Sequence, residues 1–227
     1  MRKFLIALAA LACSCALPPK APPPAVPVVP STVPAGPYQG YEVISSRVEI
    51  RVYRDGPMAQ FGHDHVITSD ALNGAIQLRE PRRDTSFKLE LPLASLVVDD
   101  PAARSAAGPE FAKEVPPADR EATRHNMLGT ALLDAARQPV LHLTAESLEG
   151  GPQEYLAQVR VGLRGEERII GVPLSVQADG ETLSVHASFK LRHVDLGLTP
   201  FSIALGALRV RDDIGVDCRL EARRSPS

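Results

Sequence analysis

The sequence has 227 residues, of which 44% are hydrophobic and 23% charged, with 25 Lys and Arg against 27 Asp and Glu. This length suffices for one sizeable domain or at most two small ones. The charge balance leaves no basic excess for a nucleic-acid backbone or an anionic membrane patch, and the composition excludes fibrous and wholly disordered proteins. We therefore expect a globular core with unusual ends.

The first residues have the pattern of a secretory signal peptide. Arg2 and Lys3 precede an unbroken apolar run over residues 4–12, which is too short to cross a bilayer as a helix. We expect residues 1–17 to be this signal, with a buried first helix or strand as the alternative. The pattern predicts secretion across the inner membrane into the periplasm.

Residues 9–13, AALAC, resemble the lipobox of bacterial lipoproteins, in which the cysteine is diacylated and becomes the new N-terminus. Cys13 is the candidate for lipidation, and Cys15 fits nearly as well. Ordinary cleavage with release of the chain is the alternative. Lipidation would attach the protein to a membrane through this N-terminal anchor.

Residues 18–40 are rich in proline. Proline lacks the N–H of other residues and holds the backbone near polyproline II, so we expect a semi-rigid spacer before a domain over residues 41–227. A docking site for a proline-binding domain is the alternative. Cys218, the sole cysteine of this domain, alternates with apolar residues and is expected to point inward.

From Tyr41 onward, apolar and polar residues alternate with a period of two, as is typical of half-buried strands. Turn signals separate these runs at Asp55-Gly56-Pro57, Asn73-Gly74, Gly150-Gly151-Pro152, Asp179-Gly180 and Asp212-Asp213. Residues 119–136 instead carry apolar residues three and four apart, which predicts one amphipathic helix with Asp119 as its N-cap. We expect residues 99–118 to form a loop.

These elements predict a mainly β fold, namely a closed antiparallel β-barrel of about eight strands with one α-helix, and a sandwich is the alternative. The inward faces are almost wholly aliphatic, which suits either a hydrocarbon ligand or a filled interior. The alternation gives the following candidates for ligand contact: Val48, Ile50, Val52, Phe87, Leu89, Leu91, Val159, Val161, Phe189 and Leu191.

The order of several short segments resembles the YceI-like family, which comprises periplasmic lipocalin-like barrels associated with polyisoprenoid and other lipid ligands. The resemblance covers residues 41–222 and is carried by the segments 46–52, 131–134, 138–143, 163–165, 195–198 and 210–214. It implies a lipid-binding barrel. The chain departs from the family at Leu132, Leu133, Leu143 and Leu196, where many members carry aromatic residues, and residues 61–67 look like a histidine-rich variant of the second strand.

His63 and His65 lie two residues apart, so on a strand they share a face and could bind one metal ion. A stable site needs a third ligand, and the nearest candidates in the sequence are distant or on the wrong face. The alternative is a hydrogen-bonded polar pair beside a turn, in which Asp64 accepts a hydrogen bond from a neighbouring backbone N–H.

The sequence lacks the Gly-x-Ser-x-Gly, phosphate-loop and Cys-x-x-Cys motifs of common catalytic sites. We therefore expect a noncatalytic envelope protein that requires no cofactor, binds no nucleic acid, and takes an amphiphilic or polyisoprenoid-type lipid as its ligand. The alternatives are a metal-binding protein centred on His63 and His65, and a structural lipoprotein whose barrel is packed. The sequence leaves the oligomeric state open.

Overall fold

A computed structural model describes residues 36–226. The predicted signal peptide, the candidate lipidation sites Cys13 and Cys15, and most of the proline-rich segment lie outside the described residues. Within the described part of the chain, no helix is long and apolar enough to span a membrane.

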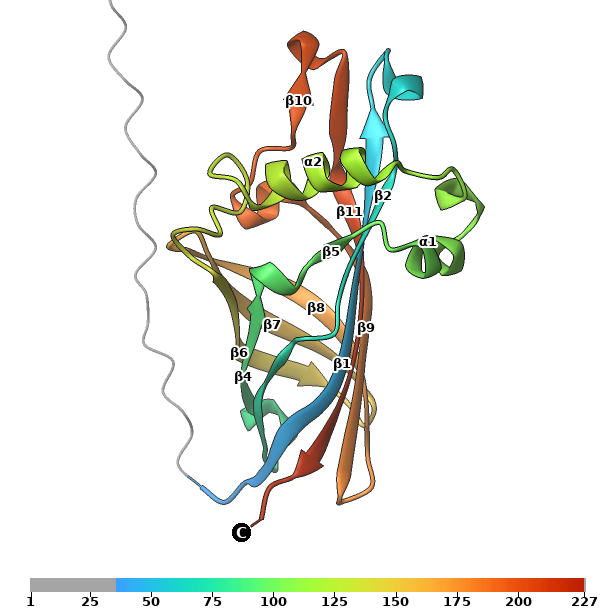
Figure 1. Ribbon diagram of the computed structural model, residues 1–227. Coiled ribbons are helices and arrows are strands. Elements are labelled where there is room, and N and C mark those ends of the chain that lie inside the picture. Colours follow the sequence, from blue (N-terminus) through green and yellow to red (C-terminus); the bar gives the residue numbers. More distant parts are fainter. Residues whose placement is uncertain (1–35, 227) are drawn as a thin grey trace, which may run out of the picture. The chain divides into compact units, whose positions relative to one another are not determined.

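Eight antiparallel strands close into a barrel, which confirms the predicted fold class (Figure 1). Around the barrel the strands are β1 (Gln39–Asp55), β3 (Asn73–Leu78), β4 (Ser86–Pro92), β6 (Val140–Gly150), β7 (Glu154–Leu163), β8 (Glu166–Ala178), β9 (Thr182–Arg192) and β11 (Leu208–Arg224). Pairing of β1 with β11, from Tyr41 with Arg224 to Asp55 with Arg209, closes the sheet. Closure leaves no free edge along the barrel wall.

Three short strands extend one end of this barrel. The second half of β1 leaves β3 and pairs with β2 (His65–Ser69), which in turn pairs with β5 (Val97–Val98). At the same end, β10 (Ser202–Ile203) pairs with the first residues of β11. The two long strands therefore project beyond the wall, as Figure 1 shows.

The described residues contain two α-helices, α1 (Pro101–Ala107) and α2 (Pro117–Leu128), where the sequence predicted one. The prediction of a loop over residues 99–118 was wrong, since α1 lies within this segment. The Asp100 carboxylate stabilises the start of α1, because it accepts hydrogen bonds from the N–H groups of Ala102 and Ala103. Pro117 opens α2, so Asp119 is not its N-cap. The helix ends before Gly129 rather than at residue 136.

Six short 3₁₀ segments connect the other elements: η1 (Ala59–Phe61), η2 (Arg82–Asp84), η3 (Leu93–Ser95), η4 (Pro109–Phe111), η5 (His193–Leu196) and η6 (Ala204–Gly206). The turns expected at residues 150–152 and 179–180 are confirmed. Asp212 and Asp213 were wrongly expected to form a turn, since both lie within β11. They are accommodated there because Asp212 accepts the Val194 N–H and Asp213 pairs with Arg211.

The main hydrophobic core lies inside the barrel, and α2 lies across one end of it (Figure 1). Met127 of α2 is buried, and Leu128, Leu132 and Leu133 pack against the same core. A second, smaller apolar cluster lies between β2 and the α1–η4 segment, where Val66 and Phe111 are fully buried. The α2 end of the barrel is therefore filled by side chains.

Candidate functional site

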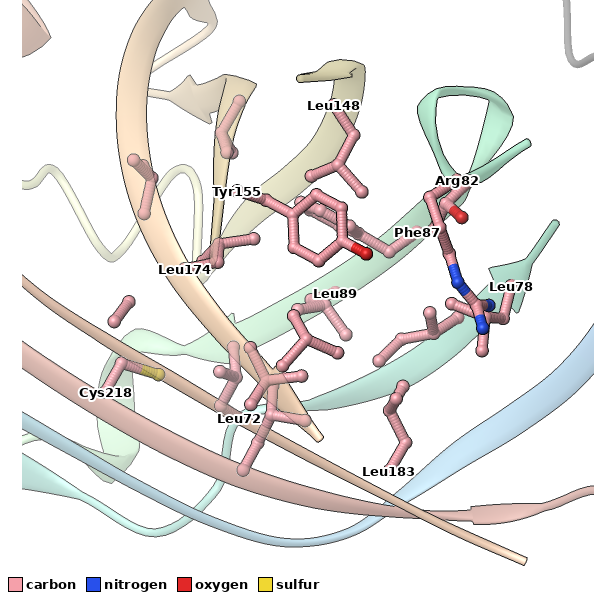
Figure 2. A pocket seen from close by; sticks show the side chains of 18 of the residues that line it. Leu72, Leu78, Arg82, Phe87, Leu89, Leu148, Tyr155, Leu174, Leu183 and Cys218 are labelled. Carbon is pink, nitrogen blue, oxygen red and sulfur yellow. The ribbon is translucent and has the colours of Figure 1, made fainter. Parts of the chain in front are cut away.

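An apolar cavity of about 170 Å³ lies inside the barrel (Figure 2). Its walls are formed by β3, β4, β6, β7, β8, β9 and β11, whose inward positions carry Leu, Ile, Val, Ala and Phe side chains. The more polar residues among those that line it are Arg82, Thr85, Tyr155 and Cys218. Such a lining suits an apolar group far better than a polar one.

The cavity occupies the half of the barrel away from α2. On β7, Tyr155 and Val159 line it, whereas Val161 belongs to the filled core nearer α2. On β9, the lining runs from Leu183 to Phe189. These positions lie toward the β3–β4, β6–β7 and β8–β9 hairpin turns. The partly exposed side chain of Arg82, in the β3–β4 turn, brings the lining to the surface at this end, which we call the open end.

The structure brings only part of the predicted ligand-contact set to this cavity. Phe87, Leu89, Val159 and Phe189 line it. The other candidates lie elsewhere: Val48, Leu91 and Val161 are buried in the core, Ile50 and Val52 are half-buried against it, and Leu191 is half-buried outside that cluster. Alternation assigns a residue to a face of the sheet, but it does not give the residue's depth along the barrel axis.

The polar atoms around the cavity have local partners. The Tyr155 hydroxyl donates to the Pro152 carbonyl at 2.9 Å. Burial raises the pKa of the Cys218 thiol to about 11, and the nearby Asp217 carboxylate adds to this rise. A thiol with this pKa is almost wholly protonated at neutral pH and is a poor nucleophile. The lining is thus suited to binding, and its thiol is not activated for chemistry.

Sequence reasoning missed Arg82. It lies in η2, the turn between β3 and β4, where neither a strand period nor a motif singles it out. Its side chain nevertheless lines the cavity, with 35% exposure to solvent, and its Nη2 lies 3.0 Å from Glu80 Oε1. The neighbouring Arg83 side chain is 76% exposed and does not line the cavity.

The histidine motif forms a separate polar cluster beside β2. His65 Nδ1 is 2.6 Å from Asp99 Oδ2, and the fully buried Asp99 carboxylate also accepts from the Val66 N–H and from Arg104. Burial alone would raise the pKa of Asp99, but the hydrogen bonds from His65, Val66 and Arg104 outweigh it and lower the pKa below its ordinary value. The cluster joins β2, β5 and α1.

His63 and His65 lie with ring centroids 6.3 Å apart. Among residues 36–226, no group of three or more His, Cys, Asp or Glu side chains is arranged to hold a metal ion. Asp64 accepts a hydrogen bond from the Arg54 backbone N–H at 2.9 Å, which is the arrangement expected for a polar pair beside a turn. Partial burial lowers the pKa of His63, as do the positive charge of Lys113 and its neighbour His65.

No protein-family model matches the sequence, and no curated protein is significantly similar to it. Among solved structures, BcnA of Burkholderia cenocepacia has a TM-score of 0.56 at 12% sequence identity, over 78% of this chain and 95% of BcnA. The YCEI protein of Campylobacter jejuni has a TM-score of 0.47 at 12% identity, over 69% of this chain and 82% of that one. This chain therefore has a barrel fold similar to that of BcnA.

Proposed function

We propose that the protein is a noncatalytic binding protein whose barrel holds the apolar part of an amphiphilic, polyisoprenoid-type lipid. The observation that carries this proposal is the apolar cavity of about 170 Å³ between the hairpin turns and the filled α2 end. Small-molecule sites are typically concave and mainly apolar, with a few polar groups that fix orientation. The resemblance of the sequence to YceI-like proteins, which are associated with such lipids, supports the same ligand class.

The size of the cavity limits what enters it without movement of the walls. An engineered apolar cavity of about 150 Å³ in another protein stays dry and binds benzene. The cavity of about 170 Å³ found here therefore accepts an apolar segment of roughly that size. A longer chain must either continue through the open end or displace side chains such as Phe189, which lines the wall.

We further propose that the protein acts in the cell envelope. The signal-peptide pattern of residues 1–17 and the lipobox-like segment ending at Cys13 support secretion and anchoring, with Cys15 as the second candidate. The proline-rich residues 18–40 would then separate the barrel from the membrane. A lipid ligand taken up near a membrane is consistent with this placement.

A cavity-filling variant tests the proposal. Ala187 is buried on β9 and lines the cavity, so Ala187→Leu adds side-chain volume where the ligand would lie. Ser188 is exposed on the same strand, so Ser188→Leu adds the same side chain on the opposite face. Binding of the neutral fluorescent probe N-phenyl-1-naphthylamine, and its displacement by farnesol, would be measured by titration of the full-length protein.

We expect saturable binding by the unmodified protein and by Ser188→Leu. Ala187→Leu should bind about tenfold more weakly, because excluding two methylenes removes about 1.6 kcal/mol of apolar burial. Urea unfolding of each variant shows whether it is folded. Absence of saturable binding by the unmodified protein would contradict the proposal, and an unchanged affinity of folded Ala187→Leu would place binding outside this cavity.

A further inference from the structure

The cavity has a charged side chain at its open end. Arg82 is the one Lys, Arg, Asp or Glu side chain found among its lining within residues 36–226, and η2 places it between the ends of β3 and β4. Figure 2 shows the guanidinium beside Leu78, at the edge of the apolar wall. The cation therefore lies where the apolar interior meets solvent.

The ion pair that Arg82 makes leaves it able to bind a ligand. Its partner Glu80 lies at 3.0 Å, and the Glu80 side chain is 73% exposed. Exposed pairs of this kind add little net stability, so another anion can replace Glu80 without a large penalty. A guanidinium offers five N–H donors in a planar fork, which matches the oxygens of a carboxylate or phosphate.

Two acidic residues at the same end, Asp179 and Asp84, are held by other partners. In the β8–β9 turn, the Asp179 carboxylate accepts hydrogen bonds from the N–H groups of Glu181 and Thr182 and from the Thr182 hydroxyl. Asp84 lies 3.8 Å from Arg83. Hydrogen bonds and the adjacent arginine thus partly neutralise these charges, which leaves the Arg82 cation facing the cavity.

We infer that Arg82 binds an anionic head group, a carboxylate or a phosphate, on the amphiphile whose apolar chain occupies the cavity. This inference rests on the proposed function and specifies its ligand class. The apolar wall would supply affinity for the chain, and the guanidinium would select acidic amphiphiles over neutral ones of the same length. Orientation follows as well, with the head group outward at η2 and the chain directed toward α2.

Three ligands with the same twelve-carbon chain test the inference: dodecanol, dodecanoate and dodecyl phosphate. Each would compete against N-phenyl-1-naphthylamine on the full-length protein, on Arg82→Gln and on Arg83→Gln. The second variant is the matched control, because Arg83 is the adjacent residue of the same turn and lies outside the cavity lining. Arg82→Lys would test whether charge alone restores the preference.

For the unmodified protein we expect at least one anionic ligand to bind about tenfold more tightly than dodecanol. Whichever of dodecanoate and dodecyl phosphate shows the larger increase in affinity over dodecanol identifies the head group as a carboxylate or a phosphate. Arg82→Gln should abolish the preference for anionic over neutral ligands, and Arg83→Gln should keep it. Added salt should weaken binding of the anions only.

Equal affinities for all three ligands, or a preference that survives Arg82→Gln, would overturn the inference while leaving the proposed function intact. Failure of dodecanol and of the neutral probe to bind at all would instead contradict the proposed function. The neutral ligand thus tests the cavity, and the difference between neutral and anionic ligands tests Arg82.

Discussion

Replacing Asp99 with asparagine should destabilise the fold strongly, because the Asp99 carboxylate is fully buried and joins three elements. It accepts from the His65 ring at 2.6 Å, from the Val66 N–H at 2.9 Å and from Arg104 at 2.6 Å. The Arg104 side chain is only 7% exposed. Asparagine keeps the shape, but it leaves this guanidinium without a counter-ion and turns an amide N–H₂ toward a donor.

Removal of one partner from a buried ion pair costs about 3–5 kcal/mol. For a domain of this size each kcal/mol lowers Tm by about 2–4 °C, so Asp99→Asn should melt about 6–20 °C below the unmodified protein. Urea unfolding followed by far-UV circular dichroism would give the change in free energy of unfolding directly.

Asp70→Asn is the control for this measurement. Asp70 pairs with Arg47 at 3.0 Å, but its side chain is 67% exposed, so the loss should be under about 1 kcal/mol. The double replacement Asp99→Leu with Arg104→Met should cost less than the sum of the two single changes, because no buried charge is left unpaired. A change below 1 kcal/mol for Asp99→Asn would refute the reasoning.

Three further predictions concern pH, the buried thiol and a glycine. The lowered pKa of Asp99 stabilises the fold at pH values above the ordinary carboxyl pKa, and this contribution is lost as the pH falls through the folded-state pKa. The urea concentration at the unfolding midpoint should therefore decrease when the pH falls below about 4, and it should decrease less in Asp99→Asn. The rate of Cys218 alkylation, measured by peptide mass spectrometry, should rise about tenfold per pH unit from pH 8 to 10, because the pKa of the thiol is about 11. A rate that reaches a plateau near pH 9 would contradict this. Gly74→Ala should destabilise by about 1–3 kcal/mol more than Gly180→Ala in urea unfolding, because the new Cβ would lie 2.2 Å from the Lys88 carbonyl oxygen, whereas Gly180 has open space. Equal effects of the two glycine replacements would count against that account.

Local patterns in the sequence predicted the barrel because they set which way each side chain faces. The alternation through β7 and β9 correctly assigned Val159 and Phe189 to the interior, where both line the cavity. The same reasoning selected Val48 of β1 as a ligand contact, but Val48 is buried in the core and does not line the cavity. Which part of the interior stays open depends on how α2 fills one end, and that contact is non-local.

Other features could not be predicted because they depend on contacts between residues that lie far apart in the sequence. His65 meets Asp99 across 34 positions, so the histidine motif alone could not reveal its partner. Helix α1 was missed because the prolines spread through residues 99–118 favoured a loop, and the Asp100 cap that stabilises its first turn is seen only in the structure. Arg82 was missed because its role arises only when the β3–β4 turn is placed at the open end of the barrel.

Native mass spectrometry of the full-length protein, purified from a bacterial envelope and compared before and after organic extraction, tests the central claim most directly. The account predicts a stoichiometric adduct that extraction removes, that fragments as an amphiphilic lipid, and that is depleted in Ala187→Leu but retained in Ser188→Leu. A protein that carries no adduct, yields no extractable lipid and takes up none when offered farnesol or dodecanoate would contradict it and favour a packed barrel.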